Sequence, residues 1–239
     1  YEASRYSFTK IMNQIYVTEG KKKNSGALEI VDRNIIKNMA DKRGILKKYI
    51  EDIHIKHGNL YRIGREYFDH LIDIFSRGEV GVFTFRAKKE EMENSPFLNT
   101  LNEYRENFVN KYQNYIKEVR KFIGELKDTE DKMGYIDDFS RYIDRLDGFF
   151  NNFNFVHEFD DDEFIYWIEV NSRKKNSKLV ATPLKVNNEL EENLYLNLDN
   201  LIFTSATIAI GDSFKYFKES IGLPNDTLDK VIHSPFDYD

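Results

Sequence analysis

The sequence predicts an α+β fold in which a long helical bundle comes before a smaller region of strands. Two observations predict it. Apolar residues recur at alternating intervals of three and four through most of residues 1–155, which is typical of helices packed on one side. After Phe155 the pattern changes to short β-rich runs bounded by polar turns. The charge changes at the same place, with 27 basic and 25 acidic residues before it and 8 basic and 16 acidic residues after it.

Helices are expected at 9–18, 27–39, 44–77, 96–126 and 135–153. The fourth begins at Ser95-Pro96, because serine caps a helix and proline fits its first position. About 30 residues at a rise of 1.5 Å give a rod of roughly 45 Å. Two such rods can bury their apolar stripes only against each other or against a third helix, so a long antiparallel bundle is expected. Within 44–77, the group His57-Gly58-Asn59 predicts a kink or break.

Strands are expected at 80–86, 164–170 and 178–182, and the polar residues 171–177 between the last two are expected to form a hairpin turn. Residues 186–196 read as a helix. The apolar run Asn200-Leu201-Ile202-Phe203 predicts a short strand buried on both faces, as in a parallel sheet. A helix over 213–221, closed by Gly222, should follow it. Strand, small polar loop and helix together make an α/β unit.

The composition excludes several classes of protein. A chain of 239 residues is long enough to bury a substantial core. The absence of cysteine excludes disulfide scaffolds, thiolate zinc sites, cysteine-held Fe–S clusters and a cysteine nucleophile. No run of 18 uncharged apolar residues is present, so no membrane span and a cytoplasmic setting are expected. The chain starts at Tyr1 without an initiator methionine, which leads us to expect a piece of something longer.

Metal and hydrolase chemistry find little support in the sequence. His54 and His57 stand three apart on a helix, but no HExxH spacing accompanies them. The acidic run from Glu158 to Glu163 lacks the spacing of a calcium loop. The Gly-x-Gly-x-x-Gly and Gly-x₄-Gly-Lys-Ser/Thr patterns are both absent, and no serine stands in a nucleophile elbow. We therefore expect no metal site, no nucleotide cradle and no hydrolase constellation in this chain.

Basic side chains recur along the helical part and alternate with aromatic residues. Phosphate neutralisation by Lys and Arg, with bases stacked on aromatic rings, is the usual chemistry of single-strand binding. The other interpretation is that the aromatics belong to the core and the charges to ordinary helix surface. The candidate nucleic-acid-binding residues are Lys42, Arg43, Lys47, Lys48, Arg62, Arg65, Arg86, Lys88 and Lys89.

The C-terminal part carries a more specific pattern. It comprises Tyr166-Trp167-Ile168-Glu169, Ala181-Thr182-Pro183-Leu184-Lys185-Val186, Leu201-Ile202-Phe203-Thr204-Ser205-Ala206-Thr207, Ser213-Phe214-Lys215-Tyr216-Phe217, Ile221-Gly222-Leu223-Pro224 and Ser234-Pro235-Phe236-Asp237-Tyr238. These ordered segments resemble the DinG family of bacterial DNA helicases, which is related to XPD in helicase superfamily 2. They cover about 75 residues, and the helical part is too divergent to be identified by itself.

The resemblance implies a division of the chain. Residues 1–18 would be the part of the first RecA-like motor domain that follows a DEAH box. Residues 19–155 would be a helical arch inserted into that domain. Residues 156–212 would return to it with a hairpin and the motif III strand, and 213–239 would begin the second motor domain. Ser205 and Thr207, with Thr204 and Ala206, match motif III, which in this family couples ATP hydrolysis to translocation.

The resemblance also implies cofactors and partners. The parent would be an ATP-dependent DNA helicase using ATP and Mg²⁺ in DNA repair. Its partners would be single-stranded DNA and the remaining motor domains of the same chain. This piece would bind no cofactor, hold no Fe–S cluster and be inactive alone. An alternative from another class stays open: a helical scaffold for protein interaction without direct nucleic-acid contact.

Overall fold

The chain forms two compact units. The computed structural model describes residues 1–17, 20, 25–88, 96–127, 129–205, 207–224 and 226–232, and of residues 96–98 and 188 only the backbone. Unit 1 comprises residues 1–161 and 165–182, and unit 2 comprises residues 162–164 and 183–239. None of the helices within these described ranges combines the length and the apolar character that crossing a membrane needs.

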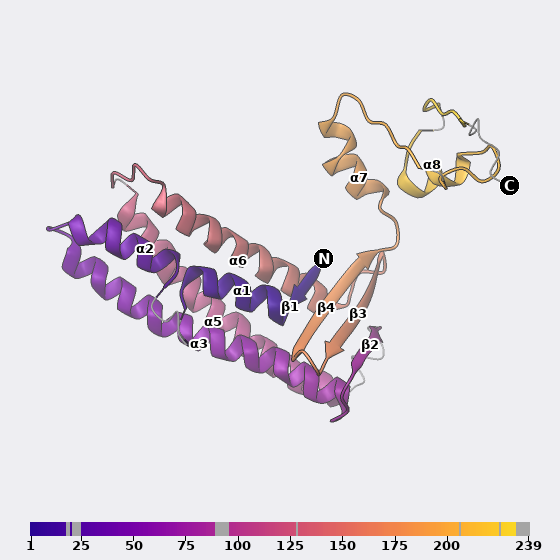
Figure 1. Cartoon of the computed structure of the whole chain (residues 1–239). Helices are drawn as coiled ribbons and strands as arrows, with labels where there is room; N and C mark the ends of the chain where they lie inside the picture. The colour runs from indigo at the N-terminus through magenta and orange to yellow at the C-terminus, as the bar shows by residue number, and fades with distance from the viewer. Residues whose placement is uncertain are drawn as a thin grey trace. The chain divides into compact units, whose positions relative to one another are not determined.

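The helices of unit 1 lie side by side as a bundle, with the sheet at the end where α3 finishes (Figure 1). All five expected helical regions are confirmed. The longest two, α3 and α5, pack against each other, and α6 packs against α1, α2 and α5. Their bounds are α1 (Arg5–Ile15), α2 (Ala27–Asn34), the 3₁₀ turn η1 (Ile36–Asn38), α3 (Arg43–Ser76), α5 (Pro96–Leu126) and α6 (Tyr135–Glu158).

The predicted kink in the first long helix is wrong. Helix α3 runs without interruption from Arg43 to Ser76. His57 and Gly64 both lie in its buried stripe, where they contact neighbouring helices instead of bending their own. Burial of the flanking residues His57 and Leu60 against the neighbouring helices therefore outweighs the low intrinsic helix propensity of Gly58.

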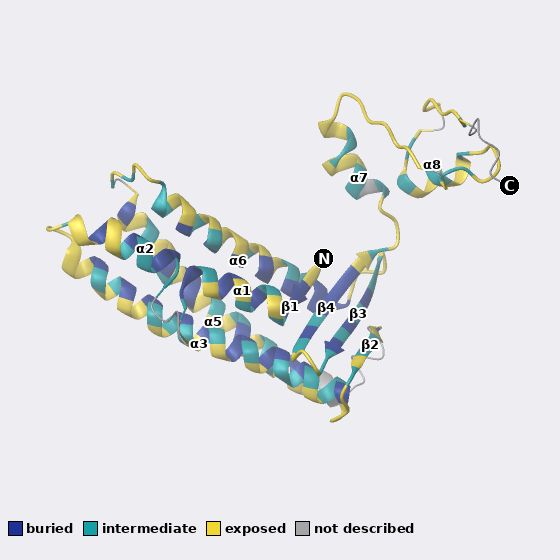
Figure 2. Cartoon of the chain, in the orientation of Figure 1, coloured by how far each residue is buried: buried dark blue, intermediate teal, exposed yellow. Residues whose placement is uncertain are grey.

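Aromatic side chains fill the centre of the bundle. Each helix is buried along one face and exposed along the other (Figure 2). Phe8 of α1 meets Phe108 of α5 at a centroid distance of 5.0 Å, and Phe108 meets Phe150 of α6 at 4.8 Å. Phe68 of α3 belongs to the same fully buried group. Burying a side chain of this size contributes about 1.5–3 kcal/mol, so the cluster holds four helices together.

An antiparallel sheet of four strands completes unit 1. Its strands are β1 (Glu2–Ser4), β2 (Val82–Ala87), β3 (Phe164–Asn171) and β4 (Asn176–Pro183), in the order β1-β4-β3-β2. The three expected strands 80–86, 164–170 and 178–182 are confirmed, and β1 was not expected. In the register, Ala3 pairs with Leu179 and Phe85 with Ile168. Because Ala3, Leu179 and Ile168 are fully buried, this face of the sheet belongs to the core.

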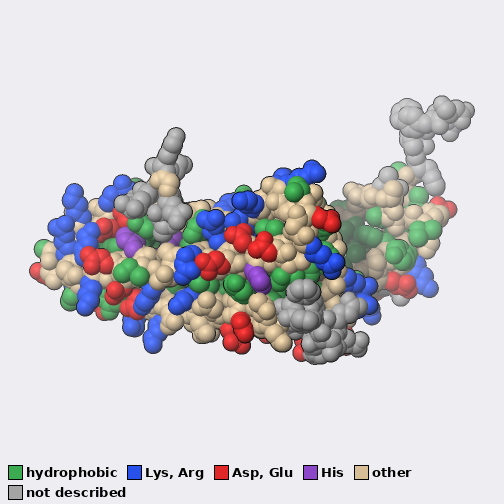
Figure 3. All heavy atoms as spheres, turned by 90° about the horizontal axis from the view of Figure 1, so that it is seen from below, with side chains coloured by type: hydrophobic (Ala, Val, Ile, Leu, Met, Phe, Trp, Pro, Cys, Tyr) green, Lys and Arg blue, Asp and Glu red, His purple; other side chains and the backbone are tan. Residues whose placement is uncertain are grey.

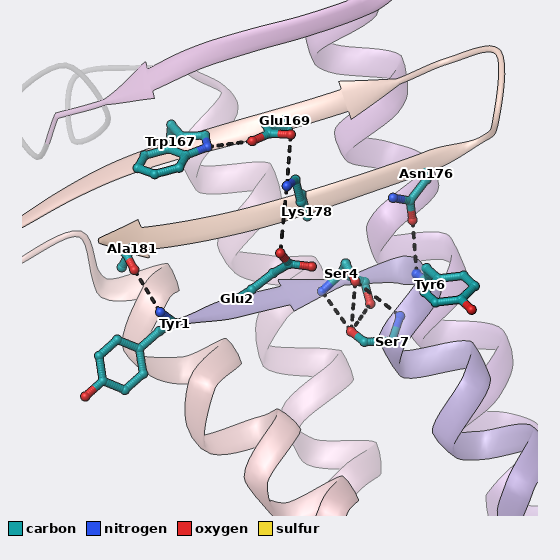
Figure 4. A network of polar contacts seen from close by, with 10 residues as sticks. All are labelled: Tyr1, Glu2, Ser4, Tyr6, Ser7, Trp167, Glu169, Asn176, Lys178 and Ala181. Atoms are coloured by element: carbon teal, nitrogen blue, oxygen red, sulfur yellow. Dashed lines mark hydrogen bonds and ion pairs between the residues drawn. The ribbon is translucent and has the colours of Figure 1, made fainter. Parts of the chain in front are cut away.

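The first residues of the chain are firmly part of unit 1. The Tyr1 amino group donates to Ala181 O at 2.8 Å, beside the pairing of β1 with β4. Ser4 then caps α1: its Oγ accepts from Ser7 N at 3.1 Å, and Ser7 Oγ accepts from Ser4 N at 3.2 Å (Figure 4). The compact units thus divide the chain near residues 162 and 183, whereas the hydrophobic pattern changes at Phe155. The strands after Phe155 complete the helical unit.

Unit 2 is a smaller unit with little regular structure. It contains α7 (Asn187–Asn193), the 3₁₀ turn η2 (Tyr195–Asn197) and α8 (Lys215–Ile221). The helix expected over 186–196 corresponds to α7 and η2. Gly222 ends α8 with a left-handed φ of 72°, as expected for a glycine in that place. The Tyr195 hydroxyl donates to Ile221 O at 2.7 Å and connects η2 to the end of α8.

Candidate functional site

The hydroxyl groups of Ser205 and Thr207 lie side by side in unit 2. Their oxygens are 3.2 Å apart, and Ser205 Oγ also accepts from Thr207 N at 3.2 Å. Thr204, Ser205 and Thr207 are all exposed, and Ala206 lies outside the described residues. The local bond fixes the spacing of the two hydroxyls, and each keeps capacity to donate or accept toward solvent or a ligand.

The predicted strand over 200–203 is absent from the described structure. Residues 198–205 have no regular structure, and Ile202 is 85% exposed. A parallel strand is stable only when it pairs with neighbours, and no described strand lies beside this segment. Phe203 is partly covered by Phe217 of α8, at a centroid distance of 5.5 Å. The apolar run therefore stands largely uncovered, which is unusual for residues of this kind.

Lys218 is a buried charged residue that the sequence did not reveal. It lies in α8 with a side-chain exposure of 8%, and its ammonium group is 2.6 Å from Asp229 Oδ2. It also donates to Thr227 O at 2.5 Å. These contacts hold residues 227–229 against α8. In the sequence Lys218 resembles any other lysine of a short helix, so no local signal indicates its burial.

Several of the predicted nucleic-acid-binding residues pair with acidic side chains. Such pairs reduce the positive potential available to a phosphate. Lys47 Nζ lies 2.5 Å from Asp32 Oδ2, Arg62 Nη1 lies 2.7 Å from Glu66 Oε1, and Lys42 Nζ lies 4.0 Å from Glu125 Oε2.

The other members of this predicted set are exposed or partly exposed. Arg65 lies over the Tyr61 ring at 5.8 Å. Arg43, Lys48 and Arg86 are exposed and form no ion pair within the described residues. Lys88 is exposed, and Lys89 lies outside the described part of the chain. Figure 3 shows basic and acidic side chains mixed along the face that it displays.

The aromatic residues between these basic side chains differ in burial, since Tyr49, Tyr61 and Phe85 are partly exposed. Tyr67 is fully buried. Tyr61 stacks against Phe8 at 6.4 Å, and Phe85 contacts Phe75 at 4.9 Å. The core interpretation therefore holds for Tyr67, while Tyr61 and Phe85 are each covered in part by another ring.

The two spaced histidines do not face a common open site. His57 is fully buried, and its Nε2 lies 3.0 Å from Met12 O. His54 Nε2 lies 3.3 Å from Glu29 Oε1, and its ring stacks on Tyr16 at 4.0 Å. Burial lowers the pKa of both histidines, to about 4 for His57, and raises the pKa of Glu29. Among the described residues, no group of three or more His, Cys, Asp or Glu could hold a metal ion.

A polar network crosses the exposed face of the sheet. Trp167 Nε1 donates to Glu169 Oε1 at 2.8 Å, and Lys178 Nζ lies 3.0 Å from the other oxygen of Glu169 and 3.7 Å from Glu2 Oε2 (Figure 4). Lys178 therefore connects three strands. Because these groups are partly exposed, the ion pairs contribute little to stability, and the network serves mainly to fix side-chain positions.

Three curated relatives of the chain are named as helicases. The chain is 37% identical over 75 residues to "ATP-dependent DNA helicase YoaA" of Haemophilus influenzae, and the matched stretch covers 31% of this chain and 11% of that protein. The chain is 27% identical over 176 residues to "Probable ATP-dependent helicase YpvA" of Bacillus subtilis, and the matched stretch covers 73% of this chain and 26% of that protein. The chain is also 32% identical over 83 residues to "ATP-dependent DNA helicase YoaA" of Escherichia coli, and the matched stretch covers 35% of this chain and 13% of that protein.

The comparisons support a helicase family. They do so at low identity and partial coverage, since the chain spans only about a tenth to a quarter of the length of these relatives. No protein-family model matches the chain. The structure leaves two features for a functional argument, the Ser205–Thr207 hydroxyl pair and the exposed, unpaired side chains Arg43, Lys48 and Arg86 of the described part of unit 1.

Proposed function

We propose that this chain is part of an ATP-dependent DNA helicase of the DinG type, in which the arch region, residues 19–155, contacts single-stranded DNA. The similarity to proteins named as ATP-dependent helicases carries this proposal. The exposed basic residues of unit 1, including Arg43, Lys48 and Arg86, are compatible with a phosphate-binding role.

The proposal assigns a place to each part of the chain. Residues 1–18 and 156–212 would belong to the first motor domain, 19–155 would form the arch, and 213–239 would begin the second motor domain. The exposed apolar run around Ile202 supports this, because a segment of such composition is stable as a strand when a parallel sheet supplies its neighbours.

Ser205 and Thr207 would act as the coupling residues of motif III. Two hydroxyls held 3.2 Å apart can exchange one hydrogen-bond partner for another when a bound group is lost. Such an exchange can bias a domain closure between two states. Neither hydroxyl has a general base within the described contacts, which favours a coupling role over a nucleophilic one.

ATP and Mg²⁺ do not fit the residues of this chain by themselves. The sequence has no Gly-x₄-Gly-Lys-Ser/Thr loop, and the described residues hold no metal-binding group of three or more His, Cys, Asp or Glu. The proposal therefore assigns the binding of both to parts of the helicase outside these 239 residues.

The test uses the full-length protein that contains this chain. In the double variant S205A/T207A, DNA-stimulated ATP hydrolysis should persist while strand unwinding falls at least about tenfold. The matched control is Ser220→Ala, because that hydroxyl bonds only to Phe217 O within its own helix. Unwinding at the level of the control would contradict the coupling role. Failure of the full-length protein to hydrolyse ATP with DNA present would contradict the helicase assignment itself.

A further inference from the structure

The turn between β3 and β4 carries three consecutive basic residues, Arg173, Lys174 and Lys175. All three are exposed, and none forms an ion pair with any residue in the described ranges. They differ in this from Lys47 and Arg62 of α3, whose charges are paired with carboxylates. Glu79 contacts the turn only through its backbone oxygen, and its carboxylate forms no ion pair among the described residues.

Local hydrogen bonds make this turn rigid. Lys174 N donates to Asn171 Oδ1 at 3.0 Å, which closes the turn from within. Ser172 Oγ donates to Glu79 O at 3.0 Å and accepts from Gly81 N at 2.9 Å, and these bonds attach the turn to the segment before β2.

The start of α1 holds the other side of the turn. Tyr6 N donates to Asn176 Oδ1 at 3.0 Å (Figure 4). The Arg5 guanidinium donates to Lys175 O, and the same group lies 3.2 Å from Asp69 of α3. The turn is therefore fixed to the start of α1 and to the segment before β2, and Arg5 is itself held by Asp69 of α3, so the backbone of the turn loses little conformational freedom when it binds a ligand.

We propose that this basic turn binds the phosphate backbone of single-stranded DNA. The inference rests on the proposed function and names a surface that it leaves open. Three unpaired cations on a rigid backbone attract a polyanion without reading its bases, because phosphate contacts position a nucleic acid and carry no sequence information. Nucleic acid is favoured over an acidic protein because the relatives include proteins named as DNA helicases.

The experiment measures binding of the 239-residue chain to a fluorescein-labelled oligothymidylate by anisotropy, over a series of salt concentrations. The variant R173Q/K174Q/K175N removes the three charges. Lys175 is replaced by asparagine because the φ of Lys175, 46°, lies in the left-handed region, which asparagine tolerates. The control K37Q/K111Q/K117Q removes three exposed charges elsewhere in unit 1 that also have no ion pair within the described residues.

The turn variant should bind at least about tenfold more weakly than wild type. The slope of log affinity against log salt should be shallower by about 2 for the turn variant, since each of the three lost single-strand phosphate contacts contributes about 0.7 to it. The control should change affinity less than about threefold. Unfolding curves of both variants, followed by the fluorescence of Trp167, show that each is folded.

Four outcomes would overturn the inference. If both triple variants lose affinity equally, net charge and not the turn is responsible. If the wild type binds and the turn variant binds equally well, the turn is not the contact, while the proposed function stands. If the wild type does not bind at low salt, or if polyglutamate competes as well as the oligonucleotide does, single-stranded DNA is not the partner of this surface.

Discussion

Gly64 of α3 lies directly against the ring of Phe8 of α1. A Cβ atom at Gly64 would come within 2.5 Å of Phe8 Cζ and 2.7 Å of Phe108 Cε2. The missing side chain therefore creates the space in which two aromatic rings meet the helix. This close approach is the reason that a glycine stands in the most buried part of a long helix.

Substituting Gly64 by alanine should destabilise unit 1. Overpacking a filled core costs about 1–3 kcal/mol, and the better helix propensity of alanine offsets up to about 1 kcal/mol of that cost. We expect a net loss of about 1–2 kcal/mol in the free energy of unfolding, measured by urea denaturation. Gly124→Ala in α5 is the control, because nothing lies within 4 Å of its Cβ position among the described residues, and it should stabilise slightly. Equal effects of the two substitutions would rule out the packing explanation.

Unit 1 should lose stability in mild acid because His57 is buried and neutral. Burial lowers the pKa of His57 from 6.5 to about 4. A lowered histidine pKa means that the unfolded chain binds more protons than the folded chain between about pH 6.5 and 4. Stability is therefore complete above this window and falls through it, by about 2 kcal/mol between pH 7 and 5 for this one group. Burial also lowers the pKa of His157, to about 3, so His157 acts in the same direction.

The variant His57→Gln separates the contribution of His57. Since Met12 O can only accept, the neutral ring donates from Nε2, and the glutamine amide can donate in its place. Urea unfolding at pH 7 and pH 5 should show a smaller loss in H57Q than in wild type, by about 2 kcal/mol. The partly exposed His70 serves as control through H70Q. A pH dependence unchanged in H57Q would exclude His57 as the acid-sensitive group.

Unit 2 should depend on the Lys218–Asp229 pair. Asp229→Asn leaves a buried ammonium group with weaker compensation, because its nearest carboxylate at 2.6 Å is lost. We expect amide hydrogen exchange in α8 to become about tenfold faster, which corresponds to about 1.4 kcal/mol. Lys218→Met, which removes the buried charge and keeps the length of the side chain, should have a smaller effect. A larger effect of K218M than of D229N would show that the ammonium group itself stabilises the unit.

Parts of the fold could be predicted because their signals are local. The buried stripe of α3 could be predicted from the spacing of its apolar residues, and the end of α8 could be predicted from Gly222. Strand β1 could not be predicted, since three residues carry no periodicity and the partner of Ala3 is Leu179. The break expected at His57-Gly58-Asn59 was wrong because the packing of His57 against Met12 connects residues 45 positions apart.

The candidate site was harder to predict for the same reason. Lys47 and Lys42 looked like free cations in the sequence, but their partners, Asp32 and Glu125, lie on other parts of the chain. The apolar composition of 200–203 is typical of a buried strand, whereas a strand also needs neighbours that composition does not reveal. The basic turn at 173–175 was identified as a turn, but its attachment to α1 depends on Arg5 and Tyr6, about 170 positions earlier.

The strand order β1-β4-β3-β2 also has a consequence for synthesis on the ribosome. Helices such as α3 can form soon after they leave the exit tunnel, because their hydrogen bonds are local. Of the four strands, β1 is made before the others and has no partner until β4, which ends at Pro183, has been made. During that interval its edge and the apolar faces of the helices are accessible to other chains, so a nascent chain of unit 1 is a natural client for a chaperone.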